Sequence, residues 1–309
     1  MLEDDARRLA RLKPNLQRRA FILGFIRELF KEQNFLEVET PIRVPTVAPE
    51  PYIVPFESSD WYLSTSPELH MKRMLAAGYE KLFQFSHCFR QGERGQWHNP
   101  EFTMLEWYRA GADYTQIIHD IELLITRLAK KLGFKNVINY QRQRIDISLP
   151  WPRTTVKNAF LKAASWDPTA AGDPRRFDID FVEKVLPSFN PERPMVLIDY
   201  PAPLASLARL KSGDSSVAER AEVFIGGLEL ANVYSELADA LEQEKRFREA
   251  IEQIRKERNQ EIAMPRLFLE AMTHLPGCAG AALGIDRLVM LVCDASTIDD
   301  VMAFTADNA

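Results

Sequence analysis

Two apolar runs that alternate with polar residues flank a charged segment, and this pattern predicts a β-hairpin with a long loop. The first run, KLFQFSHCF, ends at Phe89, and the second, FTMLEWY, begins at Phe102. Because successive side chains of a strand point to opposite faces, Phe102, Glu106 and Tyr108 should share one face, with Arg90 at the end of the first strand. That surface would present a cation for phosphate, flat rings for a base and a carboxylate for an amine. An ordinary half-buried hairpin with a polar loop is the alternative.

Apolar periodicity in the rest of the chain predicts a mixture of helices and strands. A helix and then a strand are expected within residues 1–40, followed by an extended connection in the proline-rich segment PIRVPTVAPEPYIVPF. Further helices are expected after residue 66, over about 114–132, and in ELADALEQEKRFREAIEQIRKERNQ, whose charges we assign to a solvated face. MVLIDYP predicts a buried strand, and residues 151–188 a surface insertion packed on the core.

A second hairpin is predicted in AEVFIGGLELANVYSEL, with its turn at Gly226-Gly227. With that turn, Phe224 lies opposite Glu229, and Glu222 becomes the diagonal neighbour of Glu229 on the same face. Two carboxylates on one face repel each other, but Mg²⁺ that bridges them to a triphosphate removes the repulsion. Two solvated glutamates on an edge hairpin are the alternative.

Composition and charge narrow the class of protein. The chain has 309 residues, of which 46% are hydrophobic, and this is enough for one large α/β domain over 1–309. A net charge of −5 argues against a nucleic-acid partner, which requires clustered Lys and Arg. Since no apolar run could span a bilayer and MLEDDARR is no signal peptide, we expect a cytoplasmic protein without a membrane partner. Scattered cysteines predict small buried residues, not a disulfide or zinc framework: Cys88, Cys278 and Cys293.

Three blocks of sequence resemble the motifs of class II aminoacyl-tRNA synthetases and occur in that family's order. RQGERGQWHNPEFTMLEWYRAGADY resembles motif 2, and its HNPEFT core is that of the lysyl and aspartyl branch, closest to lysyl. GCAGAALGIDRLVML, which ends at Leu291, resembles motif 3, and FLEVETPI, with Pro41, resembles the motif 1 strand that follows a long helix. The resemblance spans nearly the whole chain and implies an α+β fold in which helices flank an antiparallel sheet.

The chain departs from the lysyl-tRNA synthetase pattern at its N-terminus. Those enzymes carry an anticodon-binding barrel before motif 1, whereas here the motif 1 helix KPNLQRRAFILGFIRELFKEQNF starts almost at once. A catalytic core of this kind is similar to ligases that attach (R)-β-lysine to a lysine of translation elongation factor P. The resemblance implies ATP-dependent activation of (R)-β-lysine or lysine with Mg²⁺, and transfer to elongation factor P in place of tRNA. A truncated lysyl-tRNA synthetase, a tRNA-modifying paralogue and a non-catalytic binding module are the alternatives.

The resemblance also implies an ATP site. Arg90 is expected at the α-phosphate, His98 near the β- and γ-phosphates, and Phe102 against adenine. Arg287 is expected at the γ-phosphate, from the first turn of a helix whose N-terminus also favours an anion. The residues implied for ATP are Arg90, Glu93, His98, Asn99, Phe102, Glu229 and Arg287, with Arg90 and Arg287 catalytic and Glu222 and Glu229 binding the metal.

One motif 2 position departs from the family pattern. The family usually has Glu two residues after the motif 2 arginine, but this chain has Gly92 there and Glu93 next. Whether Glu93 takes over that role is open. The chemistry needs no protein nucleophile, because the substrate carboxylate itself attacks the α-phosphorus while the enzyme aligns the reactants and stabilises charge.

For the amino acid, the resemblance implies that Asn232 and Glu236 hold the α-amino and side-chain amino groups, alongside Glu68 and Tyr108. A buried ammonium without an anionic partner costs several kcal/mol, and Glu236 is the expected partner.

Two substitutions relative to lysyl-tRNA synthetases match the elongation factor P ligases. Ala282 stands where those synthetases have glycine, and Ser66 stands where they have alanine. A methyl group takes up space beside the amino-acid backbone, and a hydroxyl offers a hydrogen bond. Moving the amino group from the α to the β carbon would use both changes.

The motif 1 helix predicts a homodimer. It is more apolar than a surface helix should be, and Pro41 is expected to end the following strand at the family's two-fold interface. An amphipathic helix packed on its own core is the alternative. The apolar positions are Leu16, Phe21, Ile22, Phe25, Ile26 and Leu29.

Overall fold

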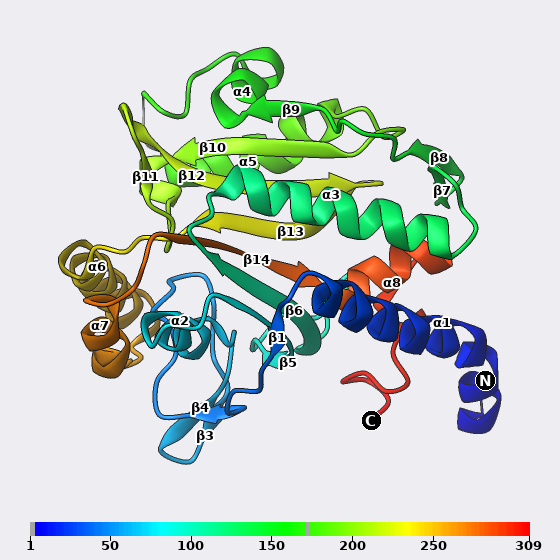
Figure 1. The fold of residues 1–309 in the computed structure, drawn as a ribbon, viewed down its shortest axis with the longest axis horizontal. Coiled ribbons are helices and arrows are strands. Elements are labelled where there is room, and N and C mark those ends of the chain that lie inside the picture. The colour runs from blue at the N-terminus through cyan, green and yellow to red at the C-terminus, as the bar shows by residue number, and fades with distance from the viewer. Residues whose placement is uncertain (1–3, 171–172) are drawn as a thin grey trace.

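A nine-stranded sheet forms the centre of the computed structural model, which describes residues 4–170 and 173–309. Its strands are β1 (Leu36–Glu37), β5 (Lys81–Phe89), β6 (Glu101–Ala110), β9 (Arg153–Thr155), β10 (Met195–Pro201), β11 (Leu210–Lys211), β12 (Asp214–Ile225), β13 (Leu228–Ser235) and β14 (Cys278–Gly284). The order is β1-β5-β6-β14-β13-β12-β10-β9, with β11 beside β12 (Figure 1). Only the end pairs β1–β5 and β9–β10 of this described sheet are parallel.

Helices cover the sheet and confirm the predicted α+β architecture. They are α1 (Asp5–Glu32), α2 (Glu68–Ala76), α3 (Tyr114–Lys131), α4 (Val156–Ala164), α5 (Pro174–Asp180), α6 (Ala240–Arg258), α7 (Arg266–Met272) and α8 (Ile285–Cys293). In Figure 1, α1, α3 and α8 lie on the same side of the sheet. Their apolar residues pack with Leu105 and Trp107 of β6 in the main core. Because side chains alternate along a strand, Met104, Glu106 and Tyr108 point to the opposite face.

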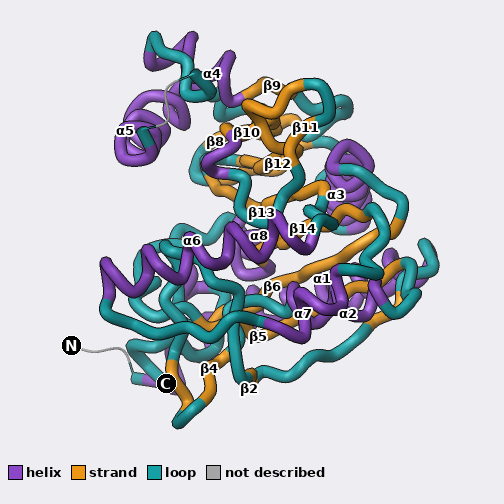
Figure 2. Tube along the Cα trace, turned by 90° about the vertical axis from the view of Figure 1, so that its left-hand side faces the viewer, coloured by secondary structure: helices purple, strands orange, loops and turns teal. Residues whose placement is uncertain are grey.

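That opposite face is covered at one end by the segment predicted as an insertion. Both views place α4 and α5 beside β9 and β10 (Figures 1 and 2). Phe160 and Phe177 stack there with ring centroids 4.6 Å apart, in a cluster that includes Phe224 of β12. The described part of the segment 151–188 supplies apolar side chains to this cluster and the strand β9 to the central sheet, which its mixed apolar pattern did not indicate.

Two short sheets lie outside the central one. β2 (Arg43–Val44), β3 (Glu57–Ser58) and β4 (Trp61–Leu63) form one, and β7 (Val137–Tyr140) and β8 (Gln143–Asp146) form the other. The prediction that Pro41 ends the motif 1 strand was wrong, because β1 ends at Glu37 after pairing with β5, and the chain then runs extended toward β2. None of the described helices is long and apolar enough to cross a membrane.

The cysteines follow the predicted pattern except at one position. Cys88 and Cys278 are buried, whereas Cys293 is only partly buried at the C-terminal end of α8. All three thiols are free.

Candidate active site

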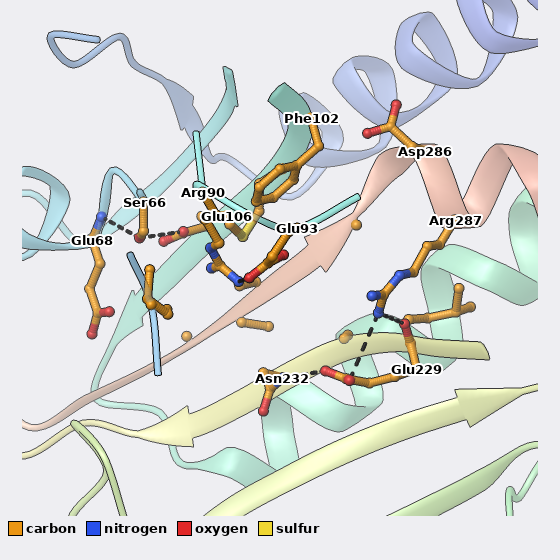
Figure 3. A pocket seen from close by; sticks show the side chains of 18 of the residues that line it. Ser66, Glu68, Arg90, Glu93, Phe102, Glu106, Glu229, Asn232, Asp286 and Arg287 are labelled. Atoms are coloured by element: carbon orange, nitrogen blue, oxygen red, sulfur yellow. Dashed lines mark hydrogen bonds and ion pairs between the residues drawn. The ribbon is translucent and has the colours of Figure 1, made fainter. Parts of the chain in front are cut away.

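A cavity of about 280 Å³ lies on the face of the sheet opposite α1, α3 and α8 (Figure 3). Strands β6, β13 and β14 form its floor. Every predicted site residue except Glu222 lines it: Ser66, Glu68, Arg90, Glu93, His98, Asn99, Phe102, Tyr108, Glu229, Asn232, Glu236, Ala282 and Arg287. Residues distant in the sequence are thus brought together by the order of the strands.

The motif 2 segment forms the predicted hairpin with a long loop and supplies one wall of the cavity. β5 and β6 pair antiparallel, with Cys88 opposite Phe102. Arg90 lies just beyond β5, and its guanidinium carbon is 5.2 Å from the centroid of the Phe102 ring. Its Nη1 is 3.8 Å from Glu93, while its Nε is buried without a hydrogen-bond partner among the described residues. A buried donor of this kind is costly unless satisfied, and an anionic ligand would satisfy it.

Motif 3 supplies a second cation beside the first turn of α8. Arg287 donates from Nη1 to the backbone oxygen of Glu229 at 2.8 Å, and its Nη2 lies 2.6 Å from Nε2 of His98. Burial lowers the pKa of His98, and the charge of Arg287 lowers it further. A neutral His98 can therefore accept a hydrogen bond from Arg287. Arg90 and Arg287 thus form a cationic end to the cavity, and His98 lines the same cavity beside Arg287.

Asn99 has a different environment from the other predicted ATP residues. Its Nδ2 donates to the backbone oxygen of Glu101 at 2.6 Å, and its Oδ1 accepts from the backbone nitrogen of Ala306 at 3.0 Å. The amide thus joins the motif 2 loop to the C-terminal segment. Its contribution to ATP binding stays a prediction.

Glu106 organises the other end of the cavity. Its Oε1 accepts a hydrogen bond from the Ser66 hydroxyl at 2.6 Å (Figure 3). Its Oε2 accepts one from the Tyr108 hydroxyl at 2.8 Å. Burial, with the charge of Glu68, raises the pKa of Glu106 to about 7. The alternation in FTMLEWY predicts Glu106 on this face, but Glu106 was not among the residues expected to bind the substrate.

Ala282 lies in the same row of the sheet as Glu106. β14 pairs Ala282 with Glu106 on one side and with Asn232 on the other. The two residues that differ from the lysyl pattern, Ser66 and Ala282, therefore both adjoin Glu106. Nearby, Gly280 has no room for a side chain, because a Cβ there would lie 2.3 Å from the Tyr108 ring.

A buried lysine, missed by the sequence analysis, bridges the two remaining carboxylates at this end. Lys72 is 1% exposed, and its Nζ lies 2.5 Å from both Glu68 and Glu236. Burial opposes the charged form, but Glu236 and Glu68 still hold the pKa of Lys72 above its ordinary value. Burial raises the pKa of Glu236 to about 8. The spacing of four residues between Glu68 and Lys72 in α2 was the available signal.

The Gly-Gly hairpin has the predicted turn and the predicted pairing next to it, but its register changes further along the strands. Gly226 and Gly227 have φ of 61° and 81°, and Phe224 lies opposite Glu229. A register shift follows, so Glu222 lies opposite Asn232 and is not the simple diagonal neighbour of Glu229. This is a β-bulge, which adds one residue to β13 and which no turn residue in the sequence indicated.

The bulge matters for the chemistry of the site. Positions 229 and 232 of a regular strand point to opposite faces. Here Asn232 Nδ2 instead donates to Glu229 Oε1 at 2.6 Å, and Glu222 accepts from Arg220 at 2.8 Å. Burial, with the charge of Glu229, raises the pKa of Glu222 to about 7. This repulsion between carboxylates is what a divalent cation would remove, so the pair fits Mg²⁺.

Phosphate oxygens would have to complete such a metal site. Among the described residues, no cluster of three or more His, Cys, Asp or Glu side chains could hold a metal ion. Mg²⁺ commonly binds through one or two carboxylates together with substrate phosphates. The donors present therefore suit a metal that arrives with a nucleotide.

Comparison with known proteins agrees with this geometry. The family model described as tRNA synthetases class II (D, K and N) matches residues 5–308. Similar curated proteins from Salmonella dublin, Salmonella paratyphi B and Salmonella heidelberg are each named elongation factor P--(R)-beta-lysine ligase. Each is 37% identical to this chain over 317 residues, which cover 96% of this chain and 96% of the relative.

Proposed function

Because this chain belongs to the class II tRNA synthetases (D, K and N), we propose that it is an ATP-dependent ligase that activates (R)-β-lysine or lysine and transfers it to a lysine side chain of elongation factor P. One observation carries the proposal: the cavity has a cationic end at Arg90 and Arg287 and an acidic end at Glu68, Glu106 and Glu236. A triphosphate suits the first, and an amino acid with two amino groups suits the second.

The activation step follows from this arrangement. The carboxylate of the amino acid attacks the α-phosphorus of ATP, an aminoacyl adenylate forms, and pyrophosphate leaves. Arg90 and Arg287 hold the phosphates and stabilise the negative charge that develops on them. The reaction needs aligned reactants but no protein nucleophile, because the substrate carboxylate is the attacking group. Glu222 and Glu229 would hold Mg²⁺, which supplies further neutralisation of phosphate charge.

The preference for β-lysine is proposed from Ser66 and Ala282. Both adjoin Glu106, whose carboxylate is a suitable partner for the amino group nearest the reacting carboxylate. The Ala282 methyl narrows the space beside that group, and Ser66 fixes the Glu106 carboxylate by a hydrogen bond. In (R)-β-lysine this amino group is on the β carbon and not on the α carbon, so its distance from the reacting carboxylate differs from that in lysine. Ser66 and Ala282 would adapt the position of Glu106 to this different distance.

Elongation factor P is the proposed acceptor because the similar proteins carry it in their names. Transfer to a lysine side chain gives an amide, whereas transfer to tRNA would give an ester. We further propose that the enzyme works in the cytoplasm as a homodimer. Partial support for the dimer comes from Phe21 of α1, which is 42% exposed. Ile22, Ile26 and Leu29 of the same helix instead pack in the chain's own core.

ATP–pyrophosphate exchange tests the activation step. Exchange that depends on (R)-β-lysine or lysine, and that other amino acids do not support, is the expected result. An enzyme without exchange for either amino acid would contradict the proposal and favour a non-catalytic binding module.

A further inference from the structure

Glu50 differs from the other carboxylates of the cavity because it has no strong partner. Glu68 and Glu236 bind Lys72, and Glu106 accepts from two hydroxyls. Glu93 lies beside Arg90, Glu229 accepts a hydrogen bond from Asn232, and Asp286 forms an ion pair with Arg19. Within residues 4–170 and 173–309, Glu50 has one hydrogen bond, 3.5 Å long, from the Ser206 hydroxyl, and no ion pair.

Glu50 also lies where the catalytic cavity meets a second cavity. This second cavity has a volume of about 620 Å³ and is bounded by the 49–53 loop, residues 202–207 and α6. Tyr52 on its rim is 71% exposed, so the cavity opens to solvent. The residues shared by the two cavities are Glu50, Ile53, Ser206, Arg220 and Tyr234. A side chain that entered the second cavity would reach the catalytic cavity past Glu50.

The charges that face Glu50 come from several elements. Glu68 of α2 repels it, whereas Arg90 beyond β5 and Arg220 of β12 attract it. Tyr234 of β13 also faces it. Burial is the largest influence and raises the pKa of Glu50 to about 6, so the group is ionised near neutral pH but is a stronger base than an ordinary glutamate. A cationic amine would give Glu50 the ion pair that it lacks among the described residues.

We propose that Glu50 is the catalytic base of the transfer step: it receives the ε-ammonium of the acceptor lysine through the second cavity and removes its proton. This rests on the proposed function. The neutral amine then attacks the carbonyl carbon of the aminoacyl adenylate, and a C–N bond forms. The C–O bond to AMP breaks, AMP leaves with the electron pair, and the second proton of the attacking nitrogen passes to solvent.

The Glu50→Gln variant separates this step from activation. We expect pyrophosphate exchange within about twofold of wild type, because the acceptor takes no part in it. The rate of transfer to elongation factor P should fall on the order of a hundredfold, the range for loss of a general base. Glu249→Gln is the matched control, since Glu249 lines the second cavity but not the catalytic one. This control should transfer at the wild-type rate.

Two further readouts distinguish a base from a structural role. With hydroxylamine as acceptor, which is uncharged near neutral pH and needs no base, Glu50→Gln should form the hydroxamate as fast as wild type. The transfer defect should also shrink as the pH rises toward about 10, where a lysine amine loses its proton unaided. A transfer defect that is equal with both acceptors and independent of pH would show that Glu50 is not the catalytic base.

The outcomes also separate this inference from the proposed function. Wild-type enzyme that forms the adenylate but leaves elongation factor P unmodified would overturn both. Wild-type enzyme that modifies the factor, together with a Glu50→Gln variant that does so equally fast, would overturn the role of Glu50 alone. Equal losses in exchange and transfer would also overturn it, because they would indicate a disturbed fold.

Discussion

Glu106 is the residue around which the acidic half of the cavity is arranged. Ser66 and Tyr108 donate hydrogen bonds to it, and Ala282 of β14 lies opposite it in the pairing with β6. The alternation in FTMLEWY predicted which face Glu106 occupies. The Ser66 contact could not be predicted, because it depends on how the start of α2 docks over β6. The contact between Lys72 and Glu236 depends on the same docking, although the spacing of Lys72 from Glu68 was a signal within α2.

The ionisation of Glu106 should make substrate affinity depend on pH. Burial raises the pKa of Glu106 to about 7, so this group is largely protonated and neutral at lower pH. Loss of its proton creates an anionic partner for a substrate ammonium group. The KM for the amino acid in pyrophosphate exchange should therefore fall as the pH rises from about 6 to about 8, with a smaller change in kcat. A flat KM profile would contradict this assignment.

Substitution of Arg90 or Arg287 should reduce activation of the amino acid without affecting folding. Replacing either by alanine removes a charge-assisted clamp, and the rate of exchange should fall on the order of a hundredfold or more. Arg248→Ala is a suitable control, because this arginine lies on α6 with 70% of its side chain exposed. Circular dichroism should match wild type in all three variants. Near-normal exchange in a site variant would remove that arginine from the site.

Ala282 predicts a change of substrate preference. Glycine at this position should reopen space beside the amino-acid backbone and favour lysine over (R)-β-lysine. A single methyl group in a pocket is worth about 1–3 kcal/mol, which corresponds to a shift of about ten- to two-hundredfold in the ratio of kcat/KM values. The measurement is exchange with each amino acid. An unchanged ratio would mean that Ala282 does not contact the substrate.

At the scale of elements, two hairpins and one helix determine the geometry of the site. The β5–β6 hairpin forms as predicted because both of its strands are long runs that alternate between apolar and polar residues. The bulge in β13 was not predictable from alternation, since it inserts a residue that breaks the pattern. Its consequence is functional, because it places Glu229 and Asn232 within hydrogen-bond distance.

From the exposed apolar position of α1 we expect a homodimer. Light scattering at micromolar concentration should give about twice the 35.5 kDa mass of the chain. Phe21→Glu should shift the particle toward the monomer by placing a charge at the exposed apolar position of α1. Leu241→Glu, on α6 and 80% exposed, should leave the mass unchanged. A wild-type particle of 35.5 kDa alone would show that α1 serves only its own core.

At the scale of the whole molecule, the fold of a class II synthetase catalytic domain carries a cavity with a cationic and an acidic end. Motif blocks and apolar periodicity predicted the antiparallel sheet and its flanking helices, and all but one of the predicted site residues line the cavity. They did not predict β9, the β13 bulge or the second cavity beside Glu50. Those features depend on contacts between segments far apart in the chain, which local patterns do not encode.

Transfer to the acceptor is the most direct test of the account. The protein is incubated with ATP, Mg²⁺, (R)-β-lysine and either elongation factor P or total tRNA, and both acceptors are then analysed by mass spectrometry. We predict that one (R)-β-lysyl group is added to a lysine of elongation factor P through an amide, with no charging of tRNA. Efficient charging of tRNA without a modified elongation factor P would contradict the account.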